Sequence, residues 1–214
     1  MGLSGTRENS PKDLALEIHE FLKTRHKTYY PRPFNRFNIE KSMWWLIPTN
    51  QFPAYKFGKF VVFQENRFFN VGIHVEKGLG TMTNNKPELT MDETWVWNEF
   101  IQALASGNVG NRLEAIQQGV GDAAETSIQV DVPDLKTERK FGFKDGVWTE
   151  EGTDIPSDIR AIPTWIDSIP QNEWFWVDLF VTFRLSKDTN VGQDDWSAYD
   201  IVRRLLEPLE QWVR

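Results

Sequence analysis

Short runs of aromatic and β-branched residues, separated by turns, occupy much of the chain, and this feature restricts the fold most. The densest run covers residues 174–185, and shorter runs cover 43–47, 59–64 and 68–75. Side chains of these types fit the pleated, half-buried surface of a sheet. Residues 65–67 read Glu-Asn-Arg between two of the runs, which is typical of a turn and predicts an antiparallel hairpin.

A second hairpin region is predicted further along the chain. Residues 127–132 and 139–143 have strand composition, and Asp145-Gly146 stands directly before another apolar pair, at residues 147–148. Asp-Gly supplies the positive φ angles that tight hairpin turns need. The sheet is therefore expected to be largely antiparallel.

Helices are expected between these strands and at both ends of the chain. Ser10, followed by Pro11 and Asp13, is typical of a helix start. Helical periodicity after residue 194 predicts a long amphipathic C-terminal helix, which Pro208 should kink or shorten. We predict an α+β fold with the helices packed mainly on one face of the sheet, in a single domain over residues 10–214 behind a flexible leader at 1–9.

Composition removes several classes of function. The chain of 214 residues has no Cys, which excludes disulfides, thiol nucleophiles and cysteine-ligated metals. A net charge of −7 gives no overall basic field that would draw the protein to nucleic acid or to an anionic membrane. The chain has no apolar signal core at its start and no run long enough to span a bilayer, so we expect a cytoplasmic protein without a membrane partner.

A local basic and aromatic segment supports the leading functional hypothesis. Lysine and arginine crowd residues 23–41, where Glu40 is the only acid, and tyrosine and phenylalanine lie among them. Cations beside rings suit single-stranded nucleic acid or an acidic protein. We therefore expect a non-catalytic binding or assembly protein, unless these charges only face solvent and the rings pack inward. The residues expected to bind the partner are Arg25, Lys27, Tyr29, Tyr30, Arg32 and Arg36.

An acidic hairpin supports an alternative, a divalent-metal-dependent hydrolase of the nuclease type. Asp131 or Asp134 precedes Glu138-Arg139-Lys140 on the next predicted strand. Carboxylate oxygens suit Mg²⁺ or Mn²⁺, and a lysine can stabilise developing negative charge. The competing interpretation is a solvated hairpin. In the hydrolase alternative, Asp131, Asp134, Glu138 and Lys140 are the catalytic candidates; otherwise no cofactor is expected.

Two further patterns leave alternatives open. His74 and Glu76 alternate on a predicted strand, so both point to one face and can share a metal with a third group. Such a pair is more common on an exposed polar strand face, which is the interpretation that the sequence favours. The chain is also rich in large rings, with 10 Trp and 15 Phe, which fits either an aromatic core or an aromatic-lined pocket for a small molecule.

Overall fold

The structure is a computed structural model that describes most of the chain. The described residues are 10–23, 29–34, 43–48, 58–66, 68–79, 95–153, 155–170, 175–185 and 196–213. The leader predicted at residues 1–9 lies outside these ranges.

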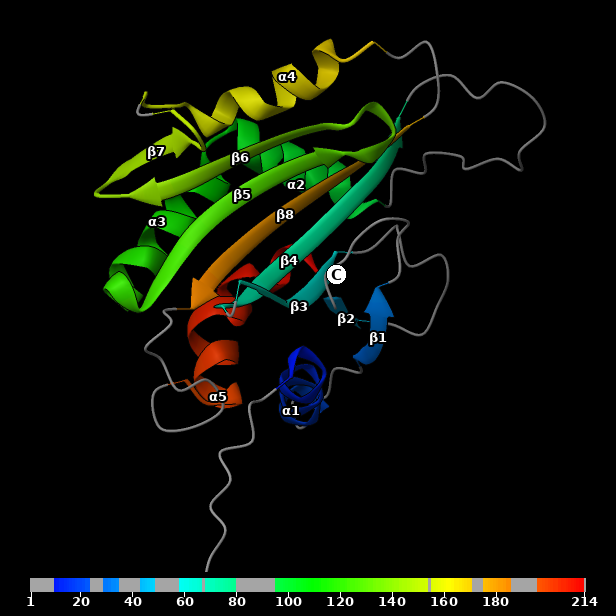
Figure 1. The fold of residues 1–214 in the computed structure, drawn as a ribbon, viewed down its shortest axis with the longest axis vertical. Helices are drawn as coiled ribbons and strands as arrows, with labels where there is room; N and C mark the ends of the chain where they lie inside the picture. Colours follow the sequence, from blue (N-terminus) through cyan, green and yellow to red (C-terminus); the bar gives the residue numbers. More distant parts are fainter. Residues whose placement is uncertain are drawn as a thin grey trace, which may run out of the picture.

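Eight strands within these ranges form one antiparallel sheet in the order β1-β2-β3-β4-β8-β5-β6-β7. The strands are β1 (Tyr30–Phe34), β2 (Met43–Ile47), β3 (Lys59–Glu65), β4 (Phe68–Leu79), β5 (Ala124–Val132), β6 (Thr137–Lys144), β7 (Val147–Glu150) and β8 (Phe175–Leu185). Figure 1 shows that the last strand in sequence lies in the middle of the sheet, between β4 and β5. The predicted antiparallel sheet is confirmed.

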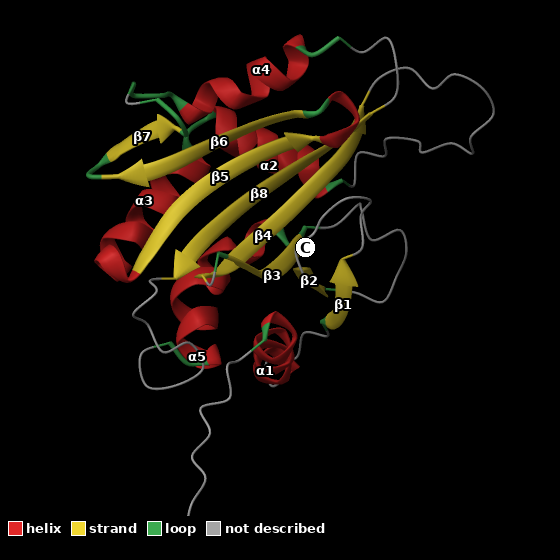
Figure 2. Cartoon of the chain, in the orientation of Figure 1, coloured by secondary structure: helices red, strands yellow, loops and turns green. Residues whose placement is uncertain are grey.

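In the described part of the chain, five helices accompany the sheet. They are α1 (Pro11–Lys23), α2 (Val96–Ala105), α3 (Asn108–Val120), α4 (Ile162–Ser168) and α5 (Ala198–Ile201), and α5 continues through a π-helical turn at Val202–Leu206 into a 3-10 segment at Glu207–Trp212. Figure 2 shows α2 and α3 behind the sheet. None of the described helices is long and apolar enough to cross a membrane.

The main core lies between the helices and one face of the sheet. Ile73 of β4 and Leu179 of β8 belong to one buried cluster with Leu104 of α2 and Leu113 of α3. Their neighbours along each strand point to the other face, because successive side chains of a strand alternate. The expected α+β architecture, with helices gathered on one face, is therefore confirmed.

Local signals in the sequence account for the ends of several elements. The Ser10 hydroxyl accepts a hydrogen bond from the Asp13 amide at 3.2 Å, so α1 begins where the capping pattern predicts. Asp145 and Gly146 have φ angles of 52° and 82°, as the predicted hairpin turn requires. The predicted C-terminal helix is confirmed over Ala198–Trp212. It changes from α to π and then to 3-10 geometry, and Pro208 lies near the start of the 3-10 segment.

Candidate functional site

The face of the sheet turned away from the main core carries a second buried cluster. Its apolar members are Met43, Val61, Phe63 and Phe180, with Trp45 packed against them. The same face buries charged and ionisable side chains from three adjacent strands, Lys59 of β3, His74 and Glu76 of β4, and Asp178 of β8. Charged groups are rarely buried unless they are paired, so this patch stands out among the described residues.

His74 and Asp178 form a buried hydrogen-bonded pair. The His74 Nε2 atom lies 2.9 Å from Asp178 Oδ1, and both side chains are almost wholly buried. Because a carboxylate accepts hydrogen bonds, we assign the ring proton to Nε2. The ring also stacks on Phe180, with centroids 4.3 Å apart and an interplanar angle of 10°. Phe180 and Asp178 together fix the orientation of the imidazole.

Lys59 and Glu76 form the second pair of this cluster. The Lys59 ammonium group contacts Glu76 Oε1, and the lysine side chain is fully buried. The ammonium nitrogen also lies 4.5 Å from the centroid of the Trp45 ring, in cation–π contact. Lys59 is directly opposite His74 in the β3–β4 ladder, so the two pairs share one patch of the sheet.

Two glycines allow the backbone to place these side chains. A Cβ atom on Gly72 would lie 1.9 Å from the Val181 carbonyl oxygen, so only glycine lets β4 approach β8 this closely, two residues before His74. A Cβ atom on Gly58 would lie 1.8 Å from the Trp212 carbonyl oxygen, which seats the C-terminal segment against the residue before Lys59. The close approach at both positions explains the absence of a side chain there.

Burial determines the protonation state of the histidine. Removal from water lowers the pKa of His74 below its ordinary value of 6.5, and the nearby Lys59 charge lowers the pKa further. The hydrogen bond to Asp178 acts in the opposite direction but is the weaker influence. The imidazole is therefore neutral at pH 7, and with the proton on Nε2 the unprotonated Nδ1 atom is the ring nitrogen that can bind a metal ion.

Three side chains in this cluster bring metal-ligating atoms together. One donor atom from each of His74, Glu76 and Asp178 lies within 4.8 Å of the others, and no other such group of three is found among the described residues. A transition-metal ion sits about 2.0–2.2 Å from nitrogen and oxygen ligands. Small side-chain movements would therefore bring all three donor atoms within bonding distance of one ion. Mixed nitrogen and carboxylate ligands suit Mn²⁺ or Zn²⁺ better than Mg²⁺.

Carboxylates extend from this cluster in a row across four strands. Glu76 is directly opposite Asp178, Asp178 is opposite Asp131, and Asp131 is opposite Glu138. Exposure rises along the row, from the buried Glu76 and Asp178 through the half-buried Asp131 to the exposed Glu138. Like charges that face each other across strands are destabilising, so stability alone would not favour this arrangement.

The structure brings together some, but not all, of the residues predicted to form the acidic hairpin site. Asp131 and Glu138 are cross-strand neighbours, and Lys140 lies on the same face two residues along β6, 3.4 Å from Glu151. Asp134 lies in the turn after β5 and accepts a hydrogen bond from the Trp176 amide at 3.0 Å, so it anchors the start of β8. The prediction that His74 and Glu76 lie on an exposed polar strand face is wrong, because both side chains are buried.

A hollow of about 760 Å³ opens on the same face beside the cluster. Gln129 and Lys140 form part of its wall, and each lies on the same cross-strand row as Phe180 and His74. Polar groups such as Ser127 and Thr182, whose hydroxyl oxygens are 2.9 Å apart, also line it. Phe63 and Phe143 are the aromatic residues in its lining, so this hollow differs from the aromatic-lined pocket considered from the sequence.

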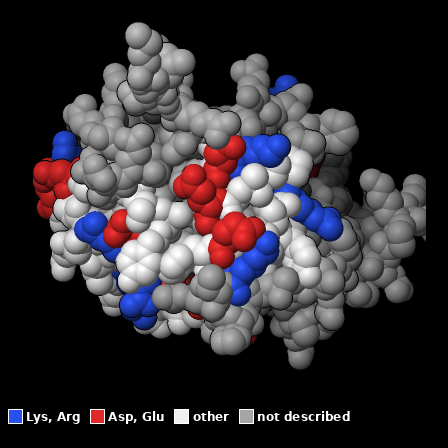
Figure 3. All heavy atoms as spheres, turned by 90° about the horizontal axis from the view of Figure 1, so that it is seen from below, with Lys and Arg blue, Asp and Glu red and all other residues white. Residues whose placement is uncertain are grey.

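The basic and aromatic segment is described only in part, since Arg25, Lys27 and Arg36 lie outside the described residues. Tyr29 is buried, donates a hydrogen bond to Glu210 at 2.9 Å and stacks on Phe60, so its ring packs inward. Tyr30 is half-buried and Arg32 is exposed. Figure 3 shows acidic and basic side chains intermingled on the face viewed from below.

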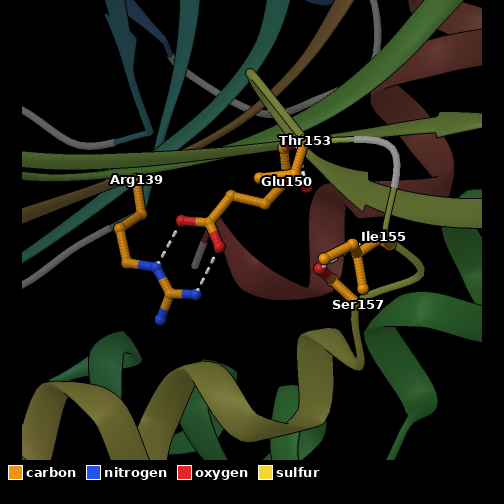
Figure 4. Close-up of polar contacts among 5 residues, drawn as sticks. All are labelled: Arg139, Glu150, Thr153, Ile155 and Ser157. Atoms are coloured by element: carbon orange, nitrogen blue, oxygen red, sulfur yellow. Dashed lines mark hydrogen bonds and ion pairs between the residues drawn. The ribbon is translucent and has the colours of Figure 1, made fainter.

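A further ion pair lies on the helix-covered side of the sheet, near α4. Figure 4 shows Arg139 of β6 facing Glu150 of β7, with two parallel hydrogen bonds of 2.7 Å. The guanidinium group also lies 5.1 Å from the ring of Trp165 on α4. Each partner keeps part of its surface exposed, in contrast to the buried pairs on the opposite face.

No protein-family model matches the sequence, and no curated protein matches it. The geometry of the cluster therefore carries the functional argument.

Lys59 and Asp178 were not identified as functional residues from the sequence. Asp178 follows His74 by 104 residues, so no local spacing connects them. One signal was present, because Asp178 is the only charged residue in the apolar strand segment at residues 175–183. A lone carboxylate in a strand that is buried on both faces needs a partner, and that requirement could have identified it.

Proposed function

We propose that the protein is a divalent-cation-dependent hydrolase whose cation is bound by His74, Glu76 and Asp178. The convergence of their three donor atoms within 4.8 Å carries this proposal. The cost of burying charge adds support, because buried ion pairs can often be replaced by apolar residues without loss of stability. Retaining both pairs on an otherwise apolar patch is expected where the charges serve a reaction.

The expected chemistry follows from a cation at the buried end of the carboxylate row. The cation would polarise a water molecule and the electrophilic centre of the substrate. Asp131 is the next carboxylate along the row and is half-buried, and it would accept the proton that the water releases. The substrate would lie in the adjoining hollow, where Lys140 can neutralise the leaving group.

Metal binding is the first test. Differential scanning fluorimetry and calorimetry with Mn²⁺ and Zn²⁺ should show a rise in melting temperature and a measurable Kd for the full chain. Asp178→Asn should abolish this response. Glu125→Gln is the matched control, because it removes an exposed carboxylate from the same face and should leave the response intact. A wild-type protein that gives no shift with either ion would refute the proposed site.

Catalysis is tested separately by filling the hollow. A Cβ atom on Gly142 would meet no atom within 4 Å, so Gly142→Phe should extend into the hollow without disturbing the backbone. We expect this variant to keep the metal-induced rise in melting temperature and to lose hydrolysis of bis(p-nitrophenyl) phosphate or p-nitrophenyl acetate. Unchanged turnover in this variant would place the substrate elsewhere.

We also infer a second candidate function, recruitment of an anionic partner at strand β1. The exposed position of Arg32, beside the half-buried Tyr30 in an edge strand, supports it. Arg32→Glu together with Arg36→Glu should abolish capture of an acidic protein or single-stranded oligonucleotide while the melting temperature stays constant. Binding that survives both substitutions would refute this function.

A further inference from the structure

Lys59 is an unusual member of the cluster, because it is a cation in a place where a metal ion is proposed to bind. Among the described residues it is the only buried lysine, and its side chain is fully shielded from solvent. Its ammonium group contacts Glu76, one of the three proposed ligands. The carboxylate that a metal ion would need is therefore already neutralised by the protein itself.

The charges of the cluster make simultaneous occupancy unfavourable. Glu76 and Asp178 contribute two negative charges beside a neutral imidazole, and Lys59 contributes one positive charge. A divalent ion added to this set would leave a buried net charge of plus one, whereas the same ion without the ammonium group would leave the cluster neutral. Buried net charge is costly, so the lysine and the ion oppose each other.

The lysine also has a means of releasing the Glu76 carboxylate. Its charge is carried on a flexible chain of four carbons, and it interacts as a point charge without the fixed two-pronged geometry of arginine. The Trp45 ring provides a second contact for the ammonium group at 4.5 Å from the ring centroid. The side chain can therefore give up Glu76 while it keeps a favourable neighbour.

We propose that Lys59 is a built-in competitor of the divalent cation, and this proposal rests on the metal site proposed above. In the absence of the ion, Lys59 neutralises Glu76 and stabilises the fold. When the ion binds, it takes over the Glu76 carboxylate from the ammonium group. Lys59 thereby lowers the affinity of the site for the ion and allows the protein to fold without it.

The test compares the wild-type full chain with Lys59→Met, using Mn²⁺ as the probe in isothermal titration calorimetry. We expect the variant to bind Mn²⁺ at least about tenfold more tightly, because one positive charge has been removed within a few ångströms of the ion. Without the ion its melting temperature should be lower than that of the wild type, since the buried Glu76 carboxylate loses the ammonium group that neutralises it. Saturating Mn²⁺ should restore much of this loss.

Two further variants separate the proposed role from a general effect of losing a lysine. Lys77→Met is the matched control, because Lys77 lies on β4 next to Glu76, points to the opposite face and donates to Asn98 at 3.1 Å. Its Mn²⁺ affinity should equal that of the wild type. Lys59→Gln serves if the methionine variant does not fold, because its amide can still donate a hydrogen bond to Glu76. It should bind Mn²⁺ more tightly for the same reason.

The outcomes distinguish this proposal from the one on which it rests. Tighter binding in Lys59→Met or Lys59→Gln, but not in Lys77→Met, supports the competitor role. Equal affinity in the wild type and the Lys59 variants refutes that role and leaves the metal site standing. No Mn²⁺ binding in any of these proteins refutes the metal site and the competitor role together.

Discussion

The two faces of the sheet carry ion pairs of opposite character. Arg139 and Glu150 form two parallel hydrogen bonds with good geometry, but their side chains are 29% and 27% exposed. Lys59 and Glu76 are 0% and 6% exposed. The first pair is partly exposed to solvent and the second is shielded from it, so the second should matter far more when one partner is removed. Good geometry therefore does not identify the pair on which the molecule depends.

Removal of one buried partner should have the largest effect. Glu76→Ala would leave the Lys59 ammonium group buried without its carboxylate, and we expect the free energy of unfolding to fall by about 3–5 kcal/mol. Urea denaturation measures this change. Glu125→Ala, which removes an exposed carboxylate from the same face, should cost less than about 0.5 kcal/mol. Similar losses in the two variants would contradict the contrast between buried and exposed charge.

The pH dependence of stability should reveal the buried histidine. Burial, followed by the charge of Lys59, lowers the pKa of His74 below 6.5 in the folded protein. The unfolded chain then binds the additional proton as the pH falls below about 6.5, so this part of the stability is complete above that pH and declines below it. The slope contributed by one proton is at most about 1.4 kcal/mol per pH unit.

His74→Gln should remove this contribution. Stability curves of the variant and the wild type, measured by urea denaturation between pH 7.5 and 5, are expected to diverge as the pH is lowered. Parallel curves would show that His74 keeps an ordinary pKa, and the buried cluster would then resemble the exposed pair more closely than we infer.

The smallest effect is expected at the pair shown in Figure 4. Arg139→Met should reduce the free energy of unfolding by less than about 1 kcal/mol, and most of this loss should disappear in 1 M salt. The hydrogen bonds from Arg139 lower the pKa of Glu150, so the contribution is present above pH 4.5 and is lost as the pH falls through the folded pKa. In the variant, the pKa of Glu150 measured by NMR should rise toward its ordinary value. A fall of several kcal/mol in the free energy of unfolding would contradict the distinction between the ion pairs on the two faces.

Local patterns predicted much of the fold, and long-range pairing accounts for most of what they missed. Ser10 predicts a helix cap and Asp145-Gly146 predicts a hairpin turn, because the interactions that they make are confined to a few neighbouring residues. Asp178 meets Glu76 and Asp131 only because β8 enters the sheet between two strands that come before it. Sequence spacing therefore identified His74 with Glu76, and Asp131 with Glu138, but not the strand that joins the two pairs.

The central position of β8 also has a consequence for the order of folding. Strands β1 to β4 and strands β5 to β7 each form a continuous antiparallel set, and β8 is the strand that joins these two sets in the sheet. During synthesis both sets emerge before β8, each with an unpaired edge that is prone to aggregation. Closure of the sheet must wait for pairings of long sequence separation, which are slow to form. A chain truncated before residue 175 should accordingly be captured by chaperones, and nascent-chain proteolysis should show protection only after β8 has left the ribosome.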